Sequence, residues 1–326
     1  MHPTDSTKPS QEAQGSPGTQ NTRTSRVSIF TAVDRFWRPC TPPTRLAALR
    51  ILVGIFALTY LLIRLPHLSS FASFDASGFR PTGVVSMLLG QPLAPPMPIL
   101  VMAVALASGA AFVLGWRFAL SGPLFAAALL WVTSYRNSWG MIFHTENLMV
   151  MHVLVLGLGA SADAWSLDAR RRLAAGLPRA DDDPRYGWPL RLAAAITIGT
   201  YMLAGIAKLR HSGLEWISSD ILRNYIAFDN LRKVELGDNY SQLGAALSRH
   251  PAIFPPLAAL SIGFELFAPI AFLNRRIAWI WSLTAWGFHV GVLALMWIFF
   301  PYPLFGLAYA PLFKLERLPF FRSLRR

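Results

Sequence analysis

Five ionisable side chains stand inside long apolar stretches of the sequence: Lys208, His289, His144, Glu265 and Arg50. Charged groups within a membrane are costly and usually face water or the interior of a helix bundle, so each is a candidate functional residue. Lysine and histidine can accept or donate a proton when their surroundings shift the charge state. A carboxylate and a guanidinium can instead neutralise each other. The residue types therefore point to proton transfer by the first three and to a structural ion pair between Glu265 and Arg50.

The three basic candidates also have structural interpretations. A lysine at the end of a span often extends to the aqueous interface, and Lys208 comes at the end of the apolar run 192–209. His144 can be an interfacial histidine bonded to a neighbour, and the nearby His152 can be a satisfied core residue. His289 lies far from either end of its apolar run, which favours a functional role.

Signatures of the common enzyme classes are missing from the sequence. It contains no Gly-rich phosphate loop, no HExxH zinc motif and no G-x-S-x-G nucleophile elbow. Its only cysteine, Cys40, excludes an intrachain disulfide and a cysteine-based zinc site. Chemistry must therefore come from polar residues dispersed over the apolar runs, and no metal site is predicted.

The composition is that of a polytopic membrane protein. Hydrophobic residues make up 53% of the 326 residues and charged residues only 14%, and the mean hydropathy is +0.40. The net charge of +13 comes from basic residues between apolar runs and not from one basic domain, so we predict no nucleic-acid partner. The predicted partner is the lipid bilayer, and the predicted fold class is all-α, a polytopic transmembrane helix bundle.

Seven apolar windows are long enough to cross a hydrocarbon core of about 30 Å. They are 46–63, 97–115, 118–134, 143–162, 192–209, 252–273 and 277–300. A further apolar piece, 303–313, is short and holds two prolines, so it is either a re-entrant segment or part of an eighth crossing. The sequence thus predicts seven to eight membrane segments.

The rest of the chain divides around this transmembrane domain, which is predicted over residues 45–314. Residues 1–28 contain almost nothing apolar and predict a disordered tail. Residues 29–44 begin with apolar residues at helical spacing opposite charged ones, which predicts an interfacial helix and a linker. Residues 315–326 form a basic C-terminal tail.

The distribution of lysine and arginine predicts a cytoplasmic N-terminus. Six basic residues lie in 1–45, six in 163–191 and five in 314–326, all on one side if eight segments cross. The segment 208–250 also carries six, but it includes five acidic residues and is assigned to the outside. Because membrane topology follows this bias, we expect an integral membrane protein with its N-terminus in the cytoplasm.

The predicted orientation sets the depth of each candidate. A rise of 1.5 Å per residue places His144 and Lys208 near the outer boundary and His289 in the outer half of its span. Glu265 lies roughly 20 Å below the outer surface on the same arithmetic, and Arg50 lies near the inner end of the first span. We therefore expect the three basic candidates to share one apolar outer cavity and Glu265 to pair with Arg50.

Short motifs in a particular order resemble those of a known membrane module. The pattern aromatic-x-x-Ala-Gly-x-x-Lys-Leu and a following Trp is made by Tyr201, Ala204, Gly205, Lys208, Leu209 and Trp216. Other matching elements are R-x-x-x-G at Arg50, the 144–168 block ending in WSLD, E-L-x-x-P at Glu265, and FH at Phe288 followed by FFPYPLF. Their order over 46–313 is similar to the HTTM family, whose module is shared with vitamin K-dependent gamma-carboxylase.

The resemblance implies a quinone-linked enzyme. In the carboxylase a base deprotonates reduced vitamin K, and the product of its reaction with oxygen removes a proton from a glutamate side chain so that CO2 can add. Lys208 falls on the position of that base, and His289 and His144 become further catalytic candidates. A reduced quinone would be the cofactor and a peptide or protein the substrate. The alternative is a non-catalytic membrane module that binds lipid, quinone or a protein partner.

Overall fold

The computed structural model describes residues 29–140 and 142–323, and within these ranges the protein is helical with no named strand. The predicted tail over 1–28 lies outside the described residues, as do residues 324–326. The α-helices are α1 Ile29–Trp37, α2 Pro43–Ser70, α3 Pro96–Leu114, α4 Phe118–Asn137, α5 Asn147–Leu158, α6 Leu167–Ala174, α7 Pro184–Ser212, α8 Glu215–Ser218, α9 Ile221–Glu235, α10 Gln242–Leu247, α11 Phe254–Leu266, α12 Arg275–Met296, α13 Pro301–Leu304 and α14 Pro319–Ser323. The 3₁₀ helices are η1 Phe71–Ser73, η2 Ala76–Gly78, η3 Gly83–Met87, η4 Pro251–Ile253, η5 Ala268–Phe272, η6 Ala310–Leu312 and η7 Leu315–Arg317.

Among the described residues, five helices are long and apolar enough to cross a membrane. They are Pro43–Ser73, Pro96–Leu114, Phe118–Asn137, Pro184–Ser212 and Arg275–Met296. Two shorter apolar helices, Asn147–Leu158 and Pro251–Leu266, occupy two further predicted windows. The all-α class and the membrane-helix character are therefore confirmed.

The last apolar piece does not form a continuous helix. The backbone at Trp297 has a φ of 53° and ends α12 at Met296, four residues before the predicted window ends. The chain then folds through α13, a turn and η6, with Tyr302 and Tyr309 buried. This segment packs into the bundle as short turns.

Glycines allow close contacts among helices α2 to α5. A Cβ added at Gly122 of α4 would lie 2.5 Å from the Gly157 carbonyl of α5, so these two helices touch through backbone. Gly115, which ends α3 with a φ of 61°, lies where a Cβ would be 2.5 Å from the Arg50 guanidinium. Only glycine suits that left-handed, crowded position, and it lets the α3–α4 turn close over Arg50.

The two peripheral segments contact the bundle. In α1, the Phe36 ring lies 5.4 Å from the ring of Phe272, and the Arg191 guanidinium lies 4.8 Å from the same Phe36 ring. In α14, Phe321 is buried and stacks on Trp165 at 5.1 Å. The beginning of the basic tail is thus held against the loop that precedes α6.

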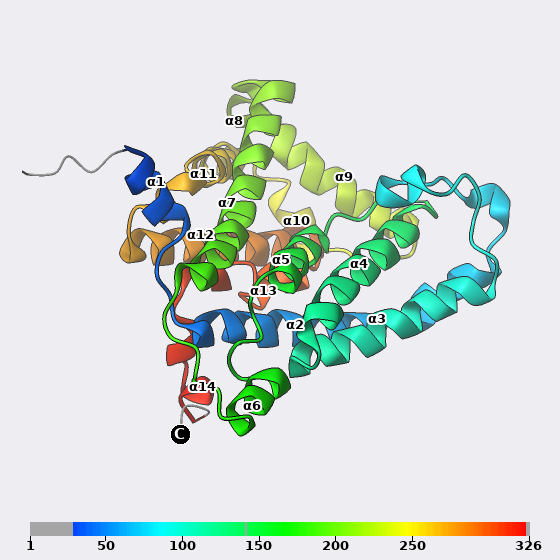
Figure 1. Ribbon diagram of the computed structural model, residues 1–326. Helices are drawn as coiled ribbons and strands as arrows, with labels where there is room; N and C mark the ends of the chain where they lie inside the picture. The colour runs from blue at the N-terminus through cyan, green and yellow to red at the C-terminus, as the bar shows by residue number, and fades with distance from the viewer. Residues whose placement is uncertain (1–28, 141, 324–326) are drawn as a thin grey trace, which may run out of the picture.

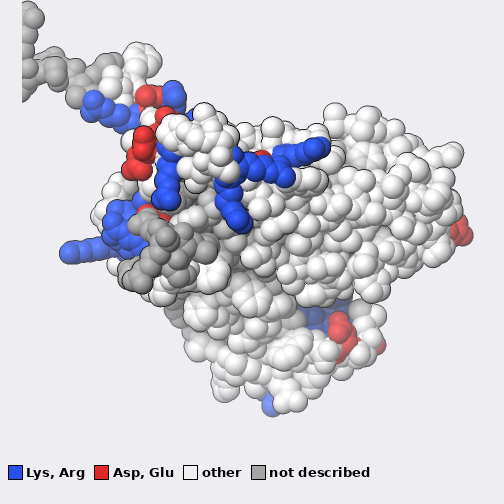
Figure 2. Space-filling view, turned by 60° about the horizontal axis from the view of Figure 1, so that its bottom comes forward, with Lys and Arg blue, Asp and Glu red and all other residues white. Residues whose placement is uncertain are grey.

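Basic side chains gather on one part of the surface. Figure 1 places α1, α14 and the beginnings of α2 and α12 towards the left of the view. Figure 2, turned about the horizontal axis so that the α6 end comes forward, shows most of the visible blue side chains on that same left side. The rest of the visible face is almost entirely uncharged.

Candidate functional site

Lys208 and Glu265 form a buried ion pair between α7 and α11. The Nζ atom of Lys208 donates to Oε1 and Oε2 of Glu265, both at 2.7 Å. The carboxylate side chain is only 3% exposed and the lysine side chain 18% exposed. Nζ also lies 5.1 Å from the ring centre of Trp216 and 5.5 Å from that of Phe288. The lysine is therefore mostly buried, between one carboxylate and two aromatic rings.

The predicted pair between Glu265 and Arg50 is not formed. Arg50 is fully buried in α2, where Nη1 donates to the Ser161 carbonyl at 3.2 Å and Nη2 to the Trp165 carbonyl at 2.7 Å. Figure 1 shows α11 almost along its axis, whereas α7 runs up the view, so these helices cross steeply. Depth counted along α11 therefore does not correspond to depth along α7, and this is why Glu265 reaches Lys208.

One face of α7 carries the polar contacts and the close approach that positions them. Tyr201, Gly205 and Lys208 follow the i, i+4, i+7 spacing of one helical face. A Cβ added at Gly205 would lie 3.0 Å from Cβ of Glu265 and 3.1 Å from the Leu266 side chain. The glycine of the motif thus allows α11 to come near enough for the ion pair.

We expect Gly205→Leu to destabilise the folded protein by about 1–3 kcal/mol, because overpacking separates α7 from α11. The measurement is the thermal unfolding midpoint in detergent. Gly199→Leu on the same helix is the matched control, since an added Cβ there meets nothing within 4 Å. Equal midpoints for the two variants would contradict the role of Gly205.

A second polar group surrounds His289. Its Nε2 lies 2.8 Å from the Tyr201 hydroxyl, which lies 2.8 Å from the Tyr309 hydroxyl. Nδ1 of His289 is buried and has no hydrogen-bond partner among the described residues. Tyr201 is one residue of the motif pattern, two helical turns before Lys208, so the two polar groups lie about 10 Å apart along α7. Tyrosine partners of His289 were not predicted.

The other two histidines differ in their surroundings. His144 is exposed, and its ring centre lies 5.9 Å from that of Phe300, which lies 5.1 Å from that of His289. His152 is fully buried and bonded to the Tyr302 hydroxyl at 2.7 Å and the Ala193 carbonyl at 3.0 Å. His152 is thus the satisfied core residue that the sequence suggested, and Phe300 separates His144 from His289.

A cavity of about 500 Å³ opens beside the ion pair. Its wall is mostly aliphatic and aromatic, and it is built by the end of α7 with α8, α9, α11 and α12. Lys208 and Trp216 line it, and Nε1 of Trp216 is a buried donor with no partner among the described residues. Lys208 and Trp216 thus bring N–H donors to a wall that is mostly apolar, although Tyr225, Ser261 and Thr284 also line it.

The cavity brings together only part of the residues of the predicted common site. Lys208 lines it, whereas His289 is not among the lining residues, although its neighbour Phe288 is. His144 is also not among them. The three basic candidates therefore do not share one cavity wall.

Side chains from α9 and the α9–α10 connection fix the far wall of the cavity by capping the end of α12. Asn230 Nδ2 donates to the Leu295 carbonyl at 2.8 Å, and Lys233 donates to the Met296 carbonyl. Ser241 donates to the Ala294 carbonyl. Because the last carbonyls of a helix have no partners within it, these bonds hold α9 and α12 together. The cavity wall is therefore built on a fixed helix end.

Comparison with protein-family models, curated proteins and solved structures found no match to this chain. Among the described residues there is also no cluster of three or more His, Cys, Asp or Glu side chains that could hold a metal ion.

Proposed function

We propose that this protein is a quinone-binding membrane enzyme of the HTTM type, in which the cavity beside Lys208 takes a reduced quinone. The observation that carries the proposal is the placement of a buried Lys208–Glu265 pair at the wall of an apolar cavity of about 500 Å³. Cavities of this size and character are typical of sites for small apolar ligands. Proton-transfer groups beside such a site are an arrangement suited to a quinone.

The lining fits the two parts of such a ligand. Leu257, Leu260 and Val292 offer an apolar surface to an isoprenoid chain, and the rings of Phe264 and Phe288 offer faces for a quinone ring. The unpartnered Nε1 of Trp216 and Nζ of Lys208 could donate to its oxygens.

Proton transfer follows from the ion pair. A bound reduced quinone would supply an ionisable hydroxyl. Nζ of Lys208 can pass a proton to a carboxylate oxygen of Glu265, because the atoms are 2.7 Å apart. The resulting neutral amine can then take the hydroxyl proton, so that Lys208 ends as ammonium and Glu265 as the protonated acid. Glu265 is thus the proton store that lets a paired lysine act as a base.

The proposed topology has seven to eight membrane segments with a cytoplasmic N-terminus and α1 in the interface. The two shorter apolar helices support the additional segments, and the basic side chains gathered on one side of Figure 2 support the orientation. The exposed apolar residues of α1, Ile29, Phe30 and Val33, support an interfacial position. A bacterial cytoplasmic membrane and a glutamate-containing peptide or protein substrate follow from the resemblance.

One observation favours a second function. Both oxygens of Glu265 already accept from Lys208, so the lysine can be a structural cation in a non-catalytic module whose cavity holds a lipid chain or a quinone. The two functions differ in whether the neutral form of Lys208 is needed.

We expect Gly291→Leu to reduce binding of a menaquinone analogue at least about tenfold, because the new side chain occupies the cavity. Gly291 lines the cavity, and an added Cβ there meets nothing within 4 Å, so the helix itself is not disturbed. The measurement is quenching of tryptophan fluorescence in purified protein, together with quinone analysis of co-purifying lipid. Gly263→Leu is the matched control, since it is equally unobstructed but does not line the cavity. Unchanged binding by Gly291→Leu would remove the quinone from this site.

A further inference from the structure

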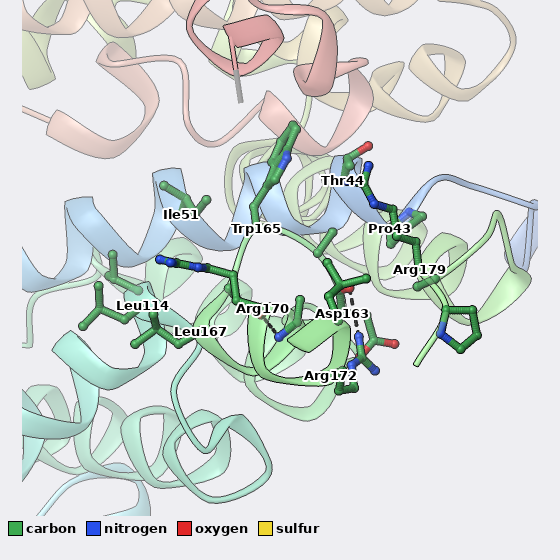
Figure 3. Close-up of a pocket in the computed structure, with 17 residues that line it drawn as sticks. Pro43, Thr44, Ile51, Leu114, Asp163, Trp165, Leu167, Arg170, Arg172 and Arg179 are labelled. Atoms are coloured by element: carbon green, nitrogen blue, oxygen red, sulfur yellow. Dashed lines mark hydrogen bonds and ion pairs between the residues drawn. The ribbon is translucent and has the colours of Figure 1, made fainter. Parts of the chain in front are cut away.

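A second cavity, of about 630 Å³, lies between α6, the beginning of α2 and the end of α3 (Figure 3). Helix α6 and the connection that follows it contribute three arginines, Arg170, Arg172 and Arg179, to its wall. The single acidic side chain in the wall is Asp163. The cavity therefore carries more positive than negative charge.

The carboxylate of Asp163 is already occupied. Oδ1 accepts from Arg172 at 3.1 Å, and Oδ2 accepts from the Tyr186 hydroxyl at 2.7 Å. Arg185 forms a further ion pair with Oδ2 at 3.1 Å. Because two arginines share this carboxylate, Asp163 neutralises none of the remaining charge in the cavity.

Arg170 and Arg179 are the two arginines left without an acidic partner among the described residues. Figure 3 shows Arg170 reaching across the cavity towards Ile51 and Leu114, whereas Arg172 turns towards Asp163. The first turn of α2 adds Thr44 to the same wall, and no side chain caps that helix end. Arg179 lies on the side of Pro43 and Thr44, so the two unpaired guanidinium groups enter the cavity at two different places.

Apart from Arg170, the side of the cavity that this arginine reaches is apolar. Ile51 of α2, Leu114 of α3 and Leu167 of α6 line it, and Ile51 and Leu114 belong to two of the candidate membrane-spanning helices. A free anion would leave this surface uncovered. A ligand with an anionic head and a hydrocarbon chain would cover both sides.

We propose that this cavity binds one anionic phospholipid of the bilayer, with its phosphate at Arg179 beside Thr44, an ester carbonyl at Arg170 and its acyl chain along Ile51 and Leu114. Guanidinium groups form strong charge-assisted hydrogen bonds to phosphate oxygens. Clustered basic residues at the ends of spans are the usual recognition element for such lipids. The site is independent of the quinone cavity.

The test is native mass spectrometry of the full chain released from a neutral detergent, after titration with phosphatidylglycerol, with phosphatidylcholine, or with inorganic phosphate. We expect one phosphatidylglycerol to be retained in preference to phosphatidylcholine. The variant Arg170→Gln/Arg179→Gln should weaken that retention at least about tenfold, because it removes both unpaired cations. Both residues are exposed, so the substitutions leave folding intact.

Arg171→Gln is the matched control. Arg171 is the neighbour of Arg170 on α6, its side chain is 61% exposed and it does not line the cavity. Retention unchanged in this control and lost in the double variant supports the site. Equal retention of the two lipids, or an equal effect of all the arginine substitutions, would overturn it. Displacement of the lipid by an equimolar amount of inorganic phosphate would assign the arginines to a free anion instead.

Discussion

Lys208→Arg is expected to fold normally and to lose turnover by about 10²–10⁴-fold, the usual contribution of a general base. Arginine keeps the positive charge and can bond both oxygens of Glu265, so the ion pair that joins α7 and α11 is retained. A guanidinium stays protonated in proteins and cannot become the neutral base. The assay follows quinol oxidation coupled to CO2 fixation in membranes, with glutamate-containing peptides as the first substrates.

Binding and activity must be measured together in this experiment. Quinone binding should survive in Lys208→Arg, whereas Lys208→Ala should lose turnover equally but also lose stability, because it leaves Glu265 buried without a cation. Arg210→Ala, two residues along α7 on the exposed surface, serves as the matched control and should keep wild-type turnover. Full turnover by Lys208→Arg would reduce the resemblance to a shared fold and favour the non-catalytic module.

The helices could be predicted from the sequence because their apolar character is a property of composition. Hydropathy windows do not report where backbone hydrogen bonding stops. The window 143–162 contains a helix only over Asn147–Leu158, because the chain at Gly159 is extended and then turns towards α6. Within the window 277–300 the helix ends at Met296, because the backbone at Trp297 is left-handed. Such ends depend on side chains from other segments, which capped α12 here.

The site was only partly predictable because its residues meet across helices that are not parallel. Lys208 was found because a lysine in an apolar run is conspicuous, and Glu265 for the same reason. Their pairing required the crossing angle of α7 and α11, which depth counting assumes to be small. Tyr201 was identified only as the aromatic residue of the motif, and Tyr309 was not a candidate, since tyrosine in an apolar run is ordinary. Both nevertheless belong to the group around His289. Polar residues in apolar runs can be identified as candidates from the sequence, but their partners depend on how the helices pack.

Glu265→Gln is expected to lower the free energy of unfolding by about 3–5 kcal/mol, because it leaves the Lys208 ammonium enclosed without its counter-charge. The amide can still accept one hydrogen bond from Nζ, but it cannot balance a charge that is only 18% exposed. The measurement is the thermal unfolding midpoint and the yield of folded protein in detergent. Glu215→Gln is a suitable control, since that carboxylate lies on the exposed surface of α8 and forms no ion pair among the described residues.

A double variant distinguishes two causes of lost stability: an unpaired buried charge and the absence of the ion pair itself. Replacing both partners, as in Lys208→Met/Glu265→Leu, removes the buried charges together, so we expect it to recover most of the stability lost in Glu265→Gln. The same double variant should have no turnover, because it lacks both the base and its proton store. The double variant would then recover stability relative to Glu265→Gln but would not recover turnover. If Glu265→Gln alone unfolds at the wild-type temperature, the ion pair is not what holds α7 to α11, and the close packing at Gly205 must do so instead.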